Sequence, residues 1–311
     1  MAPPTKEAIK QSLRRNLLKR KVFDFLFAFV GLLSLFFALV TLVALIVDLA
    51  MTGVPRLSTE FFTNFPSRFP QKAGILSAWV GTLCVMLTTA CAAIPIGVAA
   101  GIYLEEYAPK NFITGAIELN IINLAGIPSI TFGLMALGIF VYKFDFGQSI
   151  LTAGLTLGLL VLPIIIVTTR EAIRAIPKHM REAAFALGAS KWQVVQHHII
   201  PYSSGGILTG VIISLSRAIG ETAPLITIGA LTFIAFLPTP PVSTEAPFIS
   251  FSWLTDAFTV MPIQMFNWIS RPQTEFHANA AATGVVLLAM TLVMNAVAIF
   301  LRYRLRKKVR W

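Results

Sequence analysis

Long apolar runs separated by short polar segments make up most of this chain. Six of these runs are long enough to cross a bilayer, which takes about 20 mainly apolar residues at about 1.5 Å rise per residue. They cover residues 23–47, 75–104, 121–142, 149–169, 203–236 and 278–301. The pattern therefore predicts an all-α, polytopic membrane protein with six transmembrane helices.

The composition agrees with a membrane protein and excludes a soluble domain. Hydrophobic residues make up 56% of the chain and charged residues 13%, and the mean hydropathy is +0.77. The second and fifth runs are longer than a bilayer requires and contain Pro95 and Pro224, which are candidate kinks. The first run exceeds the apolar core of a cleaved signal peptide, so we expect it to be a retained anchor.

The basic residues predict the orientation of the spans. The two terminal segments, the segment after the second run and the segment between runs four and five together hold 19 Lys and Arg residues. The opposite segments hold five, and Arg217 lies within a run. By the positive-inside rule, both termini are cytoplasmic. The net charge of +11 is then a topology signal and not a sign of nucleic-acid binding.

These assignments divide the chain into four parts. A basic cytoplasmic segment (1–22) precedes the first helix and its extracytoplasmic loop (23–74). A core of five spans follows (75–301), and a basic cytoplasmic tail (302–311) ends the sequence. Within the core, the longest polar segments are a cytoplasmic loop at 170–201 and an extracytoplasmic loop at 237–277.

The cytoplasmic loop has the pattern of two short helices joined by a tight turn. Pro177 suits the first turn of a helix and Gly188 suits its C-terminal cap. Ser190 and Gln193 form a capping box for a second helix, which should end before Pro201. A DNA-binding helix-turn-helix is disfavoured because membrane spans abut both ends. A plain structural loop is an alternative, but a docking element for a cytoplasmic partner fits better.

Arg217 and Glu221 lie four residues apart inside the fifth run, and therefore on one side of a helix. An ionisable group at the bilayer centre costs roughly 2.5–3.5 kcal/mol on insertion scales. Small and polar residues share this face within an arc of about 80°; they are Gly206, Gly210, Ser214 and Pro224. Small residues let another helix approach closely.

Two interpretations of this face remain open. It is either a structural ion pair between helices or a cationic lining for an anion pathway, in which Glu221 positions Arg217. Under the second interpretation, the candidate pathway residues are Ser214, Arg217, Glu221 and Thr222.

Several chemistries are missing from the sequence. It has no G-x-x-x-x-G-K-[ST] phosphate loop, no H-E-x-x-H and no G-x-S-x-G. Among the four histidines, the only close pair is the sequential His197 and His198, which does not suggest a metal site. We therefore expect no catalytic residue, no metal and no cofactor on this chain, and a membrane-embedded enzyme is disfavoured.

The cytoplasmic loop resembles the EAA loop of ABC importer permeases. The Glu-Ala-Ala triplet begins at Glu182, a glycine follows at 188, and Ile200-Pro201 closes the motif. The sequence departs at the end, where His198 takes the usual Ile position and Ile200 the usual Leu position. The resemblance implies a type I permease fold. It also implies coupling helices that sit in a groove of an ATPase subunit, with Glu182, Ala183, Ala184, Gly188 and Ala189 as the contact residues.

Three further segments resemble permeases of the phosphate-specific ABC importer. Residues 217–225 look like the signature of this family, and their Thr-Ala-Pro-Leu ending is similar to the PstA type and not to the PstC type. Residues 101–109 and 125–130 also resemble the PstA type. With the EAA loop, the similar motifs follow one another in matching order between about residues 75 and 300.

This resemblance implies a permease that moves phosphate across a bacterial cytoplasmic (inner) membrane. The implied partners are a second permease (PstC-type), two copies of a cytoplasmic ATPase (PstB-type) that hold ATP and Mg, and an extracytoplasmic phosphate-binding protein (PstS-type). The alternatives are another oxyanion (sulfate, molybdate or phosphonate) or an ATP-independent channel. The loop at 237–277 would receive the binding protein, or its Trp253 and Trp268 would lie at the membrane interface.

Overall fold

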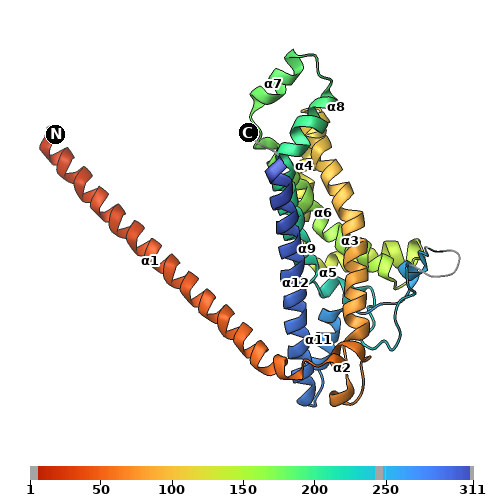
Figure 1. Cartoon of the computed structure of the whole chain (residues 1–311). Helices are drawn as coiled ribbons and strands as arrows, with labels where there is room; N and C mark the ends of the chain where they lie inside the picture. The colour runs from red at the N-terminus through yellow and green to blue at the C-terminus, as the bar shows by residue number, and fades with distance from the viewer. Residues whose placement is uncertain (1–5, 242–247, 249, 309–311) are drawn as a thin grey trace. The chain divides into compact units, whose positions relative to one another are not determined.

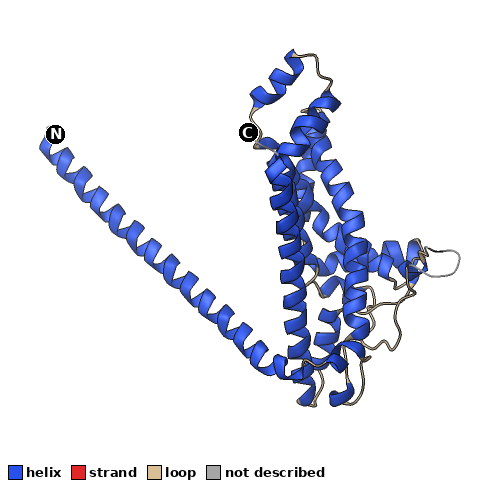
Figure 2. Ribbon diagram, in the orientation of Figure 1, coloured by secondary structure: helices blue, strands red, loops and turns tan. Residues whose placement is uncertain are grey.

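The computed structural model describes residues 6–241, 248 and 250–308, and nearly all of its ordered elements are helices (Figures 1 and 2). Within this part of the chain, the only strand-like pairing is an isolated bridge between Ser149 and Ala257. The chain separates into two units, Met1–Thr52 and Gly53–Trp311. The prediction of an all-α fold is confirmed.

The helix α1 (Lys6–Gly53) makes up the first unit. From Phe23 onward it is apolar and long enough to cross a membrane. The side chains from 23 to 47 are exposed on every side of the helix. A helix that is apolar all round suits contact with lipid, which agrees with the predicted first span.

In the second unit, four more helical paths are long and apolar enough to cross a membrane. They correspond to the predicted second, fourth and sixth spans and overlap the predicted fifth, whose ends differ. They are α3 (Leu76–Ile102) with the π-helical turn η3 (Tyr103–Tyr107), α6 (Ile150–Arg174), the continuous path α8 (Lys191–Val194), η5 (Val195–Ile199) and α9 (Ile200–Ala218), and α12 (Glu275–Lys308).

The predicted third span, 121–142, is not a single helix. The chain forms α4 (Phe112–Leu124), then breaks, and continues as α5 (Ser129–Ala136) and η4 (Leu137–Lys143). The two halves are bent by 106°. Pro128 lies at the break, where it has no N–H to donate and restricts the residue before it.

The predicted fifth span also differs at both ends. We expected a helix that stopped before Pro201, but the helical path runs through it from Lys191 to Ala218. The π-helical turn η5 widens the helix just ahead of the proline, which has no N–H of its own. The path then ends at Ala218 and not near residue 236, and Pro224 lies in the first turn of the short helix α10 (Ala223–Thr227).

Close contacts between helices hold this unit together. α6 packs between α3 and α9, and glycines lie at both contacts. A Cβ atom on Gly154 would collide with Thr88 of α3, and one on Gly210 would collide with Thr168 of α6. The small-residue face of α9 therefore permits close helix packing, as predicted.

The described part of the loop at 237–277 is folded into the body of the second unit. It contains the turn η6 (Ser252–Thr255) and the helix α11 (Met261–Ile269). Trp253 is 8% exposed and Trp268 is fully buried. Trp268 packs with Phe61 and Phe276 near the start of α12. Both tryptophans therefore pack within the protein core and do not face lipid.

Candidate functional site

The first candidate site is the turn that follows α9, residues 217–222, called here the Arg217 turn. Arg217 Nε donates a hydrogen bond to Glu221 Oε1 at 3.2 Å. The Arg217 side chain is 43% exposed and that of Glu221 is 19% exposed. Within the described residues, the other four N–H donors of Arg217 have no partner.

The Arg217 turn lies partway along the helix bundle and not at its end. Ser216 of α9 donates a hydrogen bond to Asn295 Oδ1 of α12. Asn295 is about 20 residues, or about 30 Å, from the first residue of α12 at a rise of 1.5 Å per residue. The break after Ala218 therefore places the ion pair at an intermediate depth of the bundle.

The predicted pathway residues do not all share one environment. Ser214 is fully buried, and its hydroxyl donates to the carbonyl oxygen of Gly210 at 2.8 Å. Thr222 is half-buried and adjoins the exposed Gly220. The structure thus brings Arg217, Glu221 and Thr222 together at the helix end, and it places Ser214 within the packed part of α9.

The helix α10, which follows this turn, packs on α5, the helix that begins after the break. A Cβ atom on Gly133 of α5 would collide with Thr227 and Pro224 of α10. Two of the motifs singled out in the sequence, at 125–130 and 217–225, therefore belong to neighbouring parts of the fold. The short helix after the Arg217 turn therefore packs on one half of a second interrupted helix.

The second candidate site is the loop at 170–201. It forms α7 (Lys178–Ala186), a turn at Gly188 with φ +84°, and α8. Ala189 N donates to the carbonyl oxygen of Ala184 at 3.1 Å across the turn. The capping box of Ser190 and Gln193 is present. The predicted pair of short helices and its glycine turn are confirmed.

The loop rests on a small apolar cluster and exposes other apolar residues. Ala184 is buried with Val194 and Ile199, while Glu182, Ala183 and Gly188 are exposed. Three large apolar side chains also face solvent: Phe185 at 47%, Trp192 at 59% and Leu187 at 90% exposed. Exposed aromatic and aliphatic groups together on a polar surface are typical of a protein interface.

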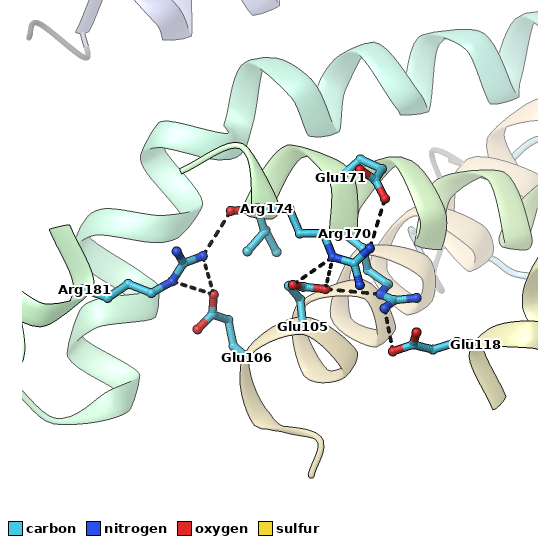
Figure 3. A network of polar contacts seen from close by, with 8 residues as sticks. Glu105, Glu106, Glu118, Arg170, Glu171, Arg174 and Arg181 are labelled. Atoms are coloured by element: carbon cyan, nitrogen blue, oxygen red, sulfur yellow. Dashed lines mark hydrogen bonds and ion pairs between the residues drawn. The ribbon is translucent and has the colours of Figure 1, made fainter. Parts of the chain in front are cut away.

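An ion-pair network joins this loop to the membrane helices (Figure 3). It is formed by Glu105, Glu106, Glu118, Arg170, Glu171, Arg174 and Arg181. The Arg170 side chain is 5% exposed and lies 3.4 Å from Glu105 and within ion-pair distance of Glu118. Its N–H groups do not point along these contacts, so they are charge attractions and not hydrogen bonds.

The remaining contacts of the network are aligned hydrogen bonds. Arg174 Nε donates to both oxygens of Glu105, at 3.0 and 2.9 Å. Arg181 Nε and an Nη donate to Glu106 Oε1, at 3.0 and 2.8 Å. Charge-assisted bonds of this kind are stronger than neutral ones.

Sequence analysis missed this network, although one signal was present. We counted the arginines of the loop only as markers of orientation, and Glu105 and Glu106 only as part of a motif. The spacing of Arg170 and Arg174 places them one turn apart on one helix face. Two consecutive glutamates at the end of an apolar run are the charges that could balance them.

The chain matches a family of transport proteins. Residues 93–311 fit the model of the "binding-protein-dependent transport system inner membrane component". The chain therefore belongs to this family, and the predicted resemblance to ABC importer permeases is confirmed.

Two relatives match across most of their length. The probable ABC transporter permease protein YqgI of Bacillus subtilis (strain 168) is 34% identical, over 86% of this chain and 91% of the relative. The phosphate transport system permease protein PstA of Haemophilus influenzae is 31% identical, over 89% of this chain and 92% of the relative.

Solved structures of ABC transporters share the fold. A bacterial ABC transporter involved in import of the acidic polysaccharide alginate matches with a TM-score of 0.63 and 14% identity, covering 93% of this chain and 99% of the other. The MetNI methionine ABC transporter, in an inward-facing conformation, matches with a TM-score of 0.53 and 17% identity, covering 74% and 94%. The predicted ABC importer permease fold is confirmed.

Proposed function

We propose that this chain is the permease subunit of an ATP-driven importer that moves inorganic phosphate across the bacterial cytoplasmic membrane. The observation that supports this function most directly is the Arg217 turn. It holds a guanidinium with four unused N–H donors at a break in a membrane helix. Interrupted helices at an intermediate depth are a common place for substrate sites in transporters.

Phosphate is favoured over other anions by the relatives, because several of them are named as phosphate transport permeases of the PstA type. Arginine alone does not distinguish phosphate from sulfate, molybdate or phosphonate, since all are oxyanions that accept several hydrogen bonds. The alternative of an ATP-independent channel is disfavoured by the loop at 170–201, which would have no role in a channel.

The energy would come from another polypeptide. In our proposal, two copies of a PstB-type ATPase bind ATP and Mg, and one of them docks on Glu182, Ala183, Gly188 and Ala189, while the buried Ala184 supports this surface from beneath. A PstC-type permease completes the pathway, and a PstS-type protein delivers phosphate from the other side. The exposed Phe185, Leu187 and Trp192 support docking, because they would be buried by a partner.

The test is uptake of labelled phosphate into vesicles that contain this chain with these three partners. We expect uptake that requires ATP and the binding protein and that resists an excess of sulfate or molybdate. Equal competition by another oxyanion would assign that anion instead. Uptake that persists without ATP would favour the channel.

The orientation has its own test, because both termini and the loop at 170–201 should be cytoplasmic. An external thiol reagent should label a cysteine at position 244, which lies outside the described residues. It should not label a cysteine introduced at Ser12 or Ser190, in a background without Cys84 and Cys91. External labelling at Ser190 would overturn both the orientation and the ATPase contact.

A further inference from the structure

The turn η3 lies between α3 and the loop at 170–201, and its last three residues contact three different elements. Glu105 pairs with arginines of α6, Glu106 pairs with α7, and Tyr107 contacts α8. Successive side chains of a helical turn point in different directions, so three consecutive residues can face three neighbours. The helices α6 and α9 are already joined to the loop by the backbone. The contacts of η3 therefore matter for α3.

The contact with α7 is the most specific of the three. Arg181 donates two hydrogen bonds to a single oxygen of Glu106, and their side chains are 19% and 10% exposed. Arg181 also donates to the carbonyl oxygens of Ile173 and Ile176, each at 3.0 Å. One guanidinium therefore joins α7, the end of α6 and the end of α3.

The contact with α8 lies next to it. Lys191 Nζ, in the first turn of α8, is 5.0 Å from the ring centroid of Tyr107. A cation at this distance from an aromatic ring is attracted to it. Ile102, one residue before η3, also packs on the apolar cluster beneath the loop. Both short helices of the loop therefore contact the end of α3.

The connectivity explains why these contacts matter. A force on the loop reaches α6 and α9 through the backbone, since α7 and α8 lie between them. α3 has no backbone link to the loop, because the chain leaves η3 toward α4 at Phe112. A displacement of the loop can therefore reach α3 only indirectly, through the packing of α6 on α3 or through the contacts of η3 with the loop.

We propose that η3 receives the movement of the ATPase-docking loop and passes it to α3, with Glu106 and Arg181 as positioning residues. Three membrane helices, α3, α6 and α9, would then respond to the loop as one body. Glu105, held by Arg170 and Arg174 of α6, fixes η3 against α6 during this movement. The inference rests on the proposed function, because it assumes that the loop docks an ATPase.

The test compares Glu106→Gln with a matched control, Glu171→Gln. Glu171 is 64% exposed and, within the described residues, pairs only with Arg174 on its own helix, so its ion pairs include neither η3 nor α7 nor α8. The first measurement is the phosphate taken up per ATP hydrolysed by the complete complex in vesicles. We expect a roughly fivefold fall for Glu106→Gln, equivalent to about 1 kcal/mol, because glutamine lacks the charge that holds Arg181. We expect no change for Glu171→Gln.

A second measurement does not depend on the ATPase. Amide hydrogen exchange of residues 178–199 in the purified permease complex should be faster in Glu106→Gln and unchanged in Glu171→Gln. A failure of the docking proposal would leave this result intact. Unchanged exchange in Glu106→Gln would overturn the role of η3 even if docking is correct.

A rescue experiment separates force transmission from simple stabilisation. Cysteines would replace Glu106 and Arg181 in a background in which Cys84 and Cys91 are alanine. A short bifunctional thiol reagent should restore the uptake-to-hydrolysis ratio, and the untreated variant should stay low. If Glu106→Gln shows faster amide exchange but a normal uptake-to-hydrolysis ratio, the Glu106–Arg181 pair only stabilises the loop. No rescue by the cross-link would also overturn the proposal.

Discussion

The Arg217 turn and the ion-pair network are built from the same two residue types but in opposite ways. In the network, Arg170 is nearly buried and faces two glutamates, while Arg174 and Arg181 have aligned carboxylate partners. In the turn, Arg217 is 43% exposed and bonds one carboxylate through one nitrogen. A charged residue in a helix bundle is therefore informative for function when the donors that its partners leave unused are also exposed, as in Arg217 and not in the buried Arg170.

The largest expected effect is a loss of stability after a substitution in the ion-pair network. Arg170→Met should destabilise the permease, because it leaves the partly buried Glu118 without its cation and Glu105 with Arg174 alone. Breaking a buried pair costs about 3–5 kcal/mol, and partial exposure of the glutamates lowers the expected value to at most about 3 kcal/mol. The measurement is the thermal unfolding midpoint of the permease in detergent.

Arg174→Met is the matched control on the same helix. Its side chain is 46% exposed, so the loss should be clearly smaller than for Arg170→Met. Equal unfolding midpoints for Arg170→Met and the parent would show that the network does not stabilise the permease. The network and the Arg217 turn would then no longer differ in this respect.

The second prediction concerns transport and not stability. Arg217→Gln keeps much of the side chain's length but removes the permanent charge. We expect phosphate uptake to fall roughly tenfold or more, because a hydrogen bond to a charged group contributes about 1.5–3 kcal/mol. The unfolding midpoint and the amount of assembled complex should stay near the parent's values.

Uptake and assembly must be measured on the same vesicles. Normal uptake by Arg217→Gln would eliminate the pathway role. A loss of assembly in step with the loss of uptake would favour the structural ion pair, and the turn would then resemble the network after all.

Much of this fold could be predicted from the sequence, because apolar runs and caps are local signals. The capping box at Ser190 and Gln193 and the turn at Gly188 need only a few neighbouring residues, and both are present. The ends of helices in the core were harder. The helix passes through Pro201 and stops at Ala218, and these outcomes depend on a π-helical turn and on packing with distant helices.

The candidate sites divide in the same way. The pairing of Arg217 with Glu221 follows from their spacing, and the structure confirms it. The pairing of Glu106 with Arg181 joins residues 75 positions apart, and no local pattern identifies it. The burial of Trp268 likewise depends on its contact with Phe61, which is distant in the sequence, as well as on Phe276.

A third prediction tests the loop itself. Gly188 has φ +84°, and a Cβ atom there would meet no other atom within 4 Å. Gly188→Asp should therefore fold, at about 1–2 kcal/mol of backbone strain, and insert in the membrane normally. We expect ATPase association or coupled uptake to fall severalfold, because a charge would enter the docking surface.

Gly188→Asn provides the control, because it has nearly the same shape and backbone preference but no charge. It should lose less than Gly188→Asp if docking excludes a charge at this position. Copurification of the ATPase measures association, and vesicles measure uptake. The docking assignment is wrong if complexes with Gly188→Asp hydrolyse ATP and transport phosphate like the parent.

The smallest effect should come from Glu221→Gln. An exposed pair contributes about 0–1 kcal/mol, and an arginine that precedes a glutamate by four residues has the weaker helix orientation. Glutamine keeps an oxygen that can accept the bond from Arg217 Nε, so the guanidinium should stay close to its position. We expect uptake to fall about twofold. A twofold change in rate corresponds to about half a kcal/mol, which lies within the range expected for such a pair. The test is uptake in the vesicles used for Arg217→Gln. A loss as large as that of Arg217→Gln would mean that the two residues act only as a bound pair, and the free donors of Arg217 would no longer distinguish the turn from the network.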